Sequence, residues 1–391
     1  MDFKLSEELT MLRDMVADFA KEQIAPYADE WDEKHYFPYE EVVKPMAELG
    51  LFGTVIPEEY GGNEMGWLAA MIITEEIARA SSSLRVQINM NTLGCAFTIF
   101  RYGTEEAKKK YIEKLVTAEY MGGFGITEPN AGSDVMSLKS TAEDKGDYWL
   151  LNGSKTWISN ASTAHCVIYY AYATVEDKKK LCAFVVDLRN ENGDQAEGVS
   201  VTDLDKMGSR SSPTGEIYLD NVKVPKQNML GKVGDGAKIV FGSLNQTRLS
   251  AAAGGVGLAQ ACLDESIKYA NEREQFGKPI GTLQMIQDQI AQMAIEIEAA
   301  RLLVYKAAVQ KDDGMLGNTL EVAMAKYKAG ETANMCAGYA MRILGAYGYS
   351  TEYSVARFYR DAPTYFMVEG SANICKFIVA MDALGLRKAN K

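Results

Sequence analysis

The chain has 391 residues, of which 47% are hydrophobic and 24% charged, and a formal net charge of −12. These values are typical of a globular protein large enough for two or three domains. The excess of negative charge argues against broad nucleic-acid binding. The sequence contains no run of about 18 apolar residues that would predict a membrane span. Its acidic start lacks the features of a signal or transit peptide, so we expect a cytoplasmic protein.

The rare residue types restrict the possible chemistry. Six cysteines are scattered without a Cys-x-x-Cys pair, and there are two histidines. This composition disfavours a metal site, a disulfide framework and a serine or cysteine hydrolase. His165 precedes a strand-like run, where a structural histidine is the simpler interpretation. Chemistry should therefore come from carboxylates, arginines or a cofactor.

Residues 1–120 have a helical pattern. Ser6 can cap a helix whose first turn is acidic. Apolar residues then recur at helical spacing, and the ranges 71–80 and 104–117 behave similarly. This part of the chain is predicted to be an N-terminal α-helical domain.

Residues 121–232 are rich in strand signals. Asn152-Gly153 separates two β-prone runs and predicts a hairpin turn. Further strands are expected at 166–172, 182–187 and 217–219. This region is predicted to be a middle β-domain.

Residues 233–391 return to helical patterns. Long apolar stripes with charged backs occupy 282–310 and 320–345, and a shorter one occupies 265–270. The order helices, strands, helices predicts a mixed α+β protein with a small β-domain inserted between two helical domains.

Three segments carry more specific information. Residues 124–134, Phe-Gly-Ile-Thr-Glu-Pro-Asn-Ala-Gly-Ser-Asp, combine small residues and hydroxyls in a loop that lets backbone approach a flat ligand. An ordinary turn between strands is the alternative. Residues 273–279 read Arg-Glu-Gln-Phe-Gly-Lys-Pro, and residues 365–371 place a glutamate and a glycine among apolar neighbours.

These segments, in this order, resemble the acyl-CoA dehydrogenase family along essentially the whole chain. The resemblance implies an N-terminal helical domain, a middle β-barrel-like domain and a C-terminal four-helix bundle. It also implies FAD bound between the β-domain and the C-terminal helices, and an assembly that is usually a homotetramer.

The same resemblance assigns cofactor contacts. The flavin ring would be lined by Phe124, Ile126 and Thr127, followed in the same loop by Gly132 and Ser133, and by a second group, Trp157, Ile158 and Ser159. Ser133 would also lie near the coenzyme A moiety of the substrate. Simple core packing is the alternative for Trp157.

Further contacts are implied near the C-terminus. Arg273 would hold the FAD pyrophosphate of a neighbouring subunit, because a guanidinium can bind two phosphate oxygens at once. Gln275 and Phe276 belong to the same motif. Ser371 and Asn373 resemble the family's threonine and glutamine flavin contacts, with shorter side chains. Arg342 and Ala346 depart from the family pattern and leave contacts to the adenine end of FAD open.

Glu369 resembles the family's catalytic base, which removes a proton alpha to a thioester carbonyl. Burial would raise its pKa toward the working range, and Gly370 would let backbone approach the substrate. Some members place the base directly before the arginine matched by Arg248, but that position is Thr247 here. Asn245 and Arg248 resemble residues near the coenzyme A chain. The implied reaction is α,β-dehydrogenation, with an electron-transferring flavoprotein as acceptor.

Arg85 lies in an otherwise small and apolar stretch. In glutaryl-CoA dehydrogenases an arginine at the matching place binds the distal carboxylate of the substrate; a surface arginine or an internal ion pair is the alternative. Decarboxylating members carry a tyrosine before the base, and a glutamate and a serine near the arginine. The matching residues here are Val368, Ala78 and Val86. We therefore predict conversion of glutaryl-CoA to glutaconyl-CoA without loss of carbon dioxide, as in anaerobic bacteria.

Other functions remain open at this point. The chain could decarboxylate glutaryl-CoA, or act on an uncharged short-chain or alicyclic acyl-CoA. A flavin-dependent oxidase lacks any marker in the sequence. A non-catalytic flavoprotein scaffold would not need the base at Glu369.

Overall fold

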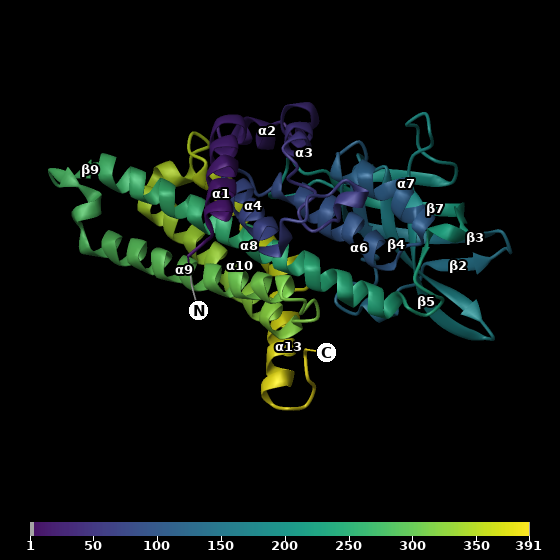
Figure 1. Cartoon of the computed structure of the whole chain (residues 1–391). Helices are drawn as coiled ribbons and strands as arrows, with labels where there is room; N and C mark the ends of the chain where they lie inside the picture. The colour runs from purple at the N-terminus through teal and green to yellow at the C-terminus, as the bar shows by residue number, and fades with distance from the viewer. Residues whose placement is uncertain (1–3, 391) are drawn as a thin grey trace.

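The computed structural model describes residues 4–390, which form a helical part, a β-sheet part and a second helical part (Figure 1). The first helical part contains α1 (Glu7–Phe19), α2 (Ala28–Glu33), α3 (Lys44–Glu48), α4 (Gly66–Ala80), α5 (Arg85–Gln87), α6 (Phe97–Tyr102) and α7 (Glu105–Val116). Ser6 caps α1, as predicted, by accepting a hydrogen bond from the N–H of Leu9 at 3.2 Å. A π-helical segment, Ile88–Ala96, links α5 to α6.

The β part is one sheet, eight-stranded among residues 4–390. Its strands are β1 (Gly122–Gly125), β2 (Thr141–Asp144), β3 (Tyr148–Ser159), β4 (Cys166–Val175), β5 (Lys178–Asp187), β6 (Val199–Asp203), β7 (Thr214–Pro225) and β8 (Met229–Leu230). Their order is β6-β7-β3-β2-β4-β5-β8, and β1 pairs with β4 in parallel. Alternate residues of β4 belong to two different hydrophobic cores, since successive side chains of a strand point to opposite faces.

The predicted hairpin turn at Asn152-Gly153 is wrong. β3 runs straight through both residues and pairs with β7, with an irregular register between Leu151 and Gly153. Gly153 has φ 140°, and a Cβ there would lie 2.3 Å from the Ser140 hydroxyl oxygen. The glycine therefore permits a bulge inside a long strand, which local sequence cannot distinguish from a turn.

The second helical part contains α8 (Gly236–Glu272), α9 (Gln284–Asp312), α10 (Thr319–Leu344), α11 (Val355–Asp361), α12 (Thr364–Met367) and α13 (Ala372–Ala383). α8 begins against β5 and runs the length of the molecule to a protruding hairpin, β9 (Glu274–Gln275) and β10 (Lys278–Pro279) (Figure 1). At about 1.5 Å per residue, α8 is about 55 Å long. It packs against α4 and α10, so it connects all three parts.

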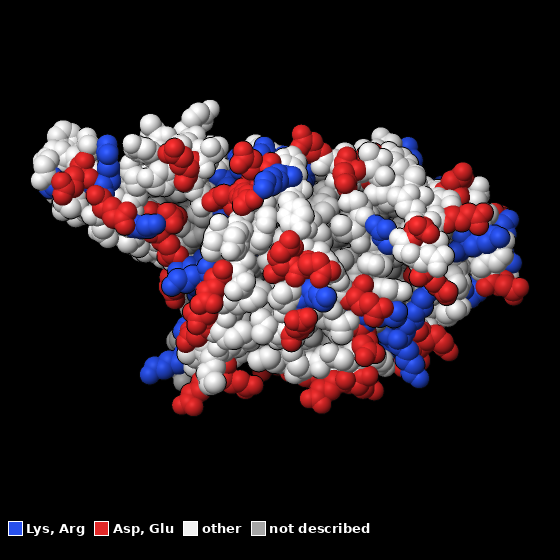
Figure 2. Space-filling view, turned by 90° about the horizontal axis from the view of Figure 1, so that it is seen from above, with Lys and Arg blue, Asp and Glu red and all other residues white. Residues whose placement is uncertain are grey.

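Acidic and basic side chains are interspersed over the face of the molecule seen in Figure 2. Among residues 4–390, no helix is both long enough and apolar enough to cross a membrane.

Candidate active site

Glu369 lies in the short loop between α12 and α13. Its φ is 56° and that of Gly370 is 91°, so two successive residues have left-handed backbone. A Cβ on Gly370 would lie 2.9 Å from Nη2 of Arg248, which explains why this position needs glycine. Ser371 then caps α13 by accepting a hydrogen bond from the N–H of Ile374 at 3.4 Å.

The Glu369 carboxylate is held by two donors from other parts of the chain. Asn89, in the π-helical segment, donates from Nδ2 to Oε1 at 3.1 Å, and Thr247, on α8, donates its hydroxyl to Oε2 at 2.5 Å. The side chain is half-buried rather than fully buried as expected from its neighbours. Glu369 is therefore oriented by fixed donors while part of it stays accessible.

The backbone around Glu369 is held by Arg248. Its Nε donates to the carbonyl oxygen of Glu369 at 2.8 Å, and burial lowers the pKa of this guanidinium. Asn245, one turn earlier on α8, donates instead to the carbonyl of Leu316 at 3.1 Å. Of the two residues predicted near the coenzyme A chain, Arg248 thus lies at the loop that carries Glu369 (368–371, between α12 and α13), which we call the base loop. Asn245 contacts the loop after α9.

Arg85, on α5, is 3% exposed. Within residues 4–390 it has no carboxylate partner, and its Nε has no hydrogen-bond acceptor. Its Cζ lies 5.3 Å from the ring centroid of Tyr365, whose hydroxyl is 3.0 Å from that of Ser82. A Cβ on Gly254 would lie 3.0 Å from Cδ and Nε of Arg85. The surface-arginine and ion-pair alternatives therefore do not describe this residue.

The three apolar residues predicted near the distal carboxylate are placed as follows. Val86 follows Arg85 and is buried, and Val368 precedes Glu369 and is half-buried. Ala78 is buried on α4, where it faces Gly257 of α8.

The two predicted groups of flavin contacts lie side by side. The N–H of Thr156 donates to the carbonyl of Thr127 at 2.9 Å, which joins the loop after β1 to the second half of β3. Phe124, Ile126 and Ile158 are buried, whereas the Trp157 side chain is 60% exposed. Gly132 and Ser133 are exposed, and nothing lies within 4 Å of a Cβ on Gly132. An exposed indole on the strand that bonds to the Thr127 loop could stack on a flat ring system, so these residues fit a flavin.

A buried ion pair, missed in the sequence, fixes these two groups. The Lys155 ammonium donates to Oε1 of Glu128 at 2.7 Å, and both side chains are buried. Burial lowers the pKa of Lys155 to about 8 although Glu128 opposes the shift. Glu128 also accepts hydrogen bonds from the backbone N–H and hydroxyl of Ser140. The pair connects the residue after Thr127 to the strand that carries Trp157.

The other predicted cofactor residues lie far from these groups. Arg273, Gln275 and Phe276 belong to the β9–β10 hairpin at the opposite end of α8 (Figure 1). Phe276 is 89% exposed, with φ 56°. A single chain therefore does not bring this motif to the β-sheet. Asn373 is exposed in the first turn of α13.

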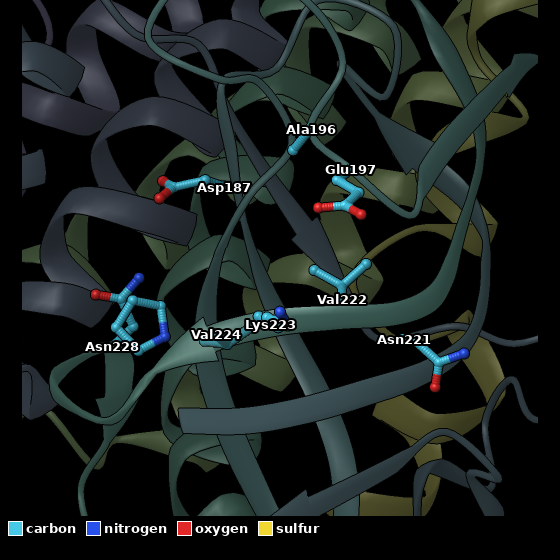
Figure 3. A pocket seen from close by; sticks show the side chains of 9 residues that line it. Asp187, Ala196, Glu197, Asn221, Val222, Lys223, Val224 and Asn228 are labelled. Carbon is cyan, nitrogen blue, oxygen red and sulfur yellow. The ribbon is translucent and has the colours of Figure 1, made fainter. Parts of the chain in front are cut away.

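A pocket of about 200 Å³ opens between the end of β5 and β7 (Figure 3). None of the predicted site residues lines it. Asp187, on its wall, is already paired with Lys110 at 2.7 Å and with the Tyr111 hydroxyl at 2.8 Å. The Asn228 amide also has partners, the Tyr111 hydroxyl and the Val185 carbonyl. Residues 4–390 contain no group of three or more side chains that could hold a metal ion.

Comparison with known proteins agrees with this geometry. Family models match residues 6–119 (acyl-CoA dehydrogenase, N-terminal domain), 123–222 (middle domain) and 234–384 (C-terminal domain). The glutaryl-CoA dehydrogenase of Desulfococcus multivorans is 69% identical over 394 residues, covering 100% of both chains.

Solved structures give the same result. A glutaryl-CoA dehydrogenase in complex with glutaryl-CoA has a TM-score of 0.97 and 68% identity, covering 100% of this chain and 98% of the other. A glutaryl-CoA dehydrogenase of Mycobacterium smegmatis in complex with FADH2 has a TM-score of 0.91 and 26% identity, covering 97% and 95%. The predicted fold, with helical, β and helical domains, is confirmed.

Proposed function

The chain belongs to the acyl-CoA dehydrogenase family, whose enzymes depend on FAD, and from this premise we propose that it oxidises glutaryl-CoA to glutaconyl-CoA and keeps the distal carboxylate. The observation that carries the substrate is the buried, unpaired guanidinium of Arg85. The relative from Desulfococcus multivorans supports the same substrate.

Arg85 needs an anion that the described part of the chain does not provide. Burying a charge without a partner is unfavourable, whereas a carboxylate can pair with a guanidinium through two parallel hydrogen bonds. The distal carboxylate of glutaryl-CoA would be that anion. Tyr365 supports the guanidinium from one side and thereby restricts its position.

Glu369 would remove the α-proton of the bound thioester. Asn89 and Thr247 orient its two oxygens, and Arg248 holds its carbonyl group. Among residues 4–390 nothing accepts a hydrogen bond from the N–H of Glu369, so this donor is available to the thioester oxygen, where charge develops. FAD, when bound, supplies the acceptor for the β-hydride. The residues around Phe124 and Trp157 would hold its ring.

Retention of the carboxylate follows from firm pairing in an apolar setting. Carbon dioxide can leave only if the negative charge of the carboxylate moves into the acyl chain. Pairing with Arg85 stabilises the carboxylate before the reaction and opposes that step. Val86 and Val368 stand at the positions where the decarboxylating members would carry a serine and a tyrosine.

The test is product analysis. The FAD-loaded protein is incubated with glutaryl-CoA and an artificial electron acceptor, and the thioesters are identified by mass spectrometry. Glutaconyl-CoA alone is expected. Formation of crotonyl-CoA with stoichiometric carbon dioxide would support glutaryl-CoA as the substrate but reject the proposal that the carboxylate is retained. Turnover of butyryl-CoA but not of glutaryl-CoA would reject the substrate.

We also propose a homo-oligomer, with an electron-transferring flavoprotein as the acceptor of the electrons. The β9–β10 hairpin supports the assembly, because it carries Arg273 away from the β-sheet of its own chain (Figure 1). A second copy could place that arginine at the FAD pyrophosphate. Light scattering after size-exclusion chromatography would give the mass in solution, and a monomer that retains FAD would reject the proposal.

A further inference from the structure

A buried lysine on α10 donates hydrogen bonds to backbone carbonyls on both sides of Glu369. Lys326 is 1% exposed. Its Nζ donates to the carbonyl oxygen of Tyr365 at 2.7 Å and to that of Gly370 at 3.1 Å. The first acceptor belongs to the residue whose ring packs on Arg85, and the second to the residue directly after Glu369. One ammonium group therefore brackets residues 365–370.

Burying the Lys326 ammonium costs free energy, because the charge loses its hydration. No carboxylate within residues 4–390 forms an ion pair with it. Burial lowers its pKa to about 8; the nearby Arg248 and Arg85 add to this shift, and Cys375 and Glu369 oppose it. An apolar side chain of similar length would avoid the desolvation cost. The lysine therefore serves its two carbonyl acceptors rather than a counter-ion.

The loop between these carbonyls is strained. Glu369 has left-handed backbone, which is unfavourable for a residue with a side chain and persists where surrounding contacts impose it. Arg248 holds the carbonyl of Glu369, and Lys326 holds the carbonyl after it. Two buried cations on two different helices thus impose the conformation of the base loop.

We propose that Lys326 is a positioning residue that sets the place of Glu369 and, through Tyr365, couples the base to the Arg85 end of the acyl site. The first half of this proposal concerns the base for any acyl-CoA. The second half rests on the proposed function, because it requires a substrate carboxylate at Arg85.

The experiment isolates the proton step. FAD-loaded wild-type protein and Lys326→Met are incubated in D2O, without oxygen or an electron acceptor, with glutaryl-CoA or butyryl-CoA, and deuterium at the α-carbon is measured by mass spectrometry. Misplacing the base by about 1 Å should slow exchange about 10²-fold with either substrate. The loss should be greater with glutaryl-CoA, and it should appear in the exchange rate at saturating substrate while FAD content stays unchanged.

Lys311→Met is the matched control. Lys311, on α9, is also buried, at 2% exposed, and burial lowers its pKa to about 7. It donates to the carbonyl of Leu316 in the loop that follows α9. Because that carbonyl also accepts from Asn245, the comparison is made at saturating substrate. This variant should lose thermal stability yet keep the wild-type exchange rate.

The outcomes separate the two halves of the proposal. Two results for Lys326→Met would overturn the positioning role. One is exchange at the wild-type rate. The other is a decrease in exchange that is explained entirely by a smaller amount of FAD-loaded protein. Equal losses with the two substrates would overturn the coupling to Arg85. Exchange with butyryl-CoA but none with glutaryl-CoA in the wild type would reject the proposed substrate and leave the base role tested. If Lys326→Met does not fold, Lys326→Gln, which keeps an N–H donor, takes its place. It should slow exchange relative to the wild type with either substrate, and wild-type exchange in it would overturn the positioning role.

Discussion

The molecule contains two arginines predicted to bind anions, and they lie in opposite settings. Arg85 is buried beside Tyr365 without an ionic partner in the described chain, whereas Arg273 lies exposed at the β9–β10 hairpin. A buried charge needs an opposite charge or hydrogen-bond acceptors, and Nε of Arg85 has neither within residues 4–390, while an exposed charge is satisfied by water. The proposed role of Arg85 can therefore be argued from one chain, whereas the proposed role of Arg273 depends on a second copy.

The largest expected effect comes from replacing the proposed base, which sets the scale against which the two arginine variants are compared. Glu369→Gln should lower kcat about 10³-fold, because a general base contributes roughly that much. FAD absorbance should be unchanged, since the ring contacts predicted around Phe124 and Trp157 lie on other elements and the substitution leaves Ser371 and Asn373 in place. Steady-state kinetics with glutaryl-CoA and a visible spectrum measure both. Wild-type activity in this variant would refute the assignment of the base.

Arg85→Leu should produce the next largest effect. Without the guanidinium, the substrate carboxylate would be buried unpaired, so kcat/KM for glutaryl-CoA should fall by about 10²-fold or more. Butyryl-CoA turnover should be spared. The ratio of the two kcat/KM values is the measurement; a parallel fall with both substrates would indicate a structural arginine and erase the contrast with Arg273.

Gly254→Ala tests whether the exact placement of Arg85 matters. The new Cβ would lie 3.0 Å from Cδ and Nε of Arg85, so the guanidinium must shift. We expect kcat/KM for glutaryl-CoA to fall about tenfold, since small displacements of positioning groups are costly. Gly338→Ala, on α10 with nothing within 4 Å of its Cβ, is the matched control and should be neutral.

Arg273→Leu should have the smallest effect. Loss of one exposed, charge-assisted contact should weaken FAD binding about fivefold. The ratio of glutaryl-CoA to butyryl-CoA turnover should stay unchanged once FAD is saturating. Titration of the apoprotein with FAD gives the affinity. A change in substrate preference would break the comparison, because it would connect the far hairpin to the acyl site within one chain.

The sequence singled out the residues predicted for the acyl end of the site. Arg85 and Glu369 were found because a charged residue in an apolar stretch is informative, and Thr247 was noted as the alternative base position. Its hydroxyl does contact Glu369, although as a donor to the carboxylate. Asn89 and Lys326 gave no local signal. Each acts through residues at least 39 positions away along the chain, and such contacts have no periodicity or motif.

The turn prediction failed where one glycine allows two outcomes, although the residues on both sides of it are strand as predicted. Asn152-Gly153 is a strong turn signal by composition, but β3 continues through it because Ser140 leaves no room for a side chain and β7 pairs along most of its length. The ion pair between Glu128 and Lys155 was missed for a related reason. Lysine and glutamate are ordinarily exposed, and their burial depends on how the loop after β1 meets β3.

The sequence by itself determined the order of helical, β and helical regions and the family, because helical and strand periodicity, capping and short motifs act over a few residues. Only the tertiary structure decided which donors hold Glu369, that Arg85 lacks an ionic partner among residues 4–390, and that the Arg273 hairpin lies far from the β-sheet. These features depend on how separate helices and strands pack, and burial of a charge is a property of that packing rather than of the residue.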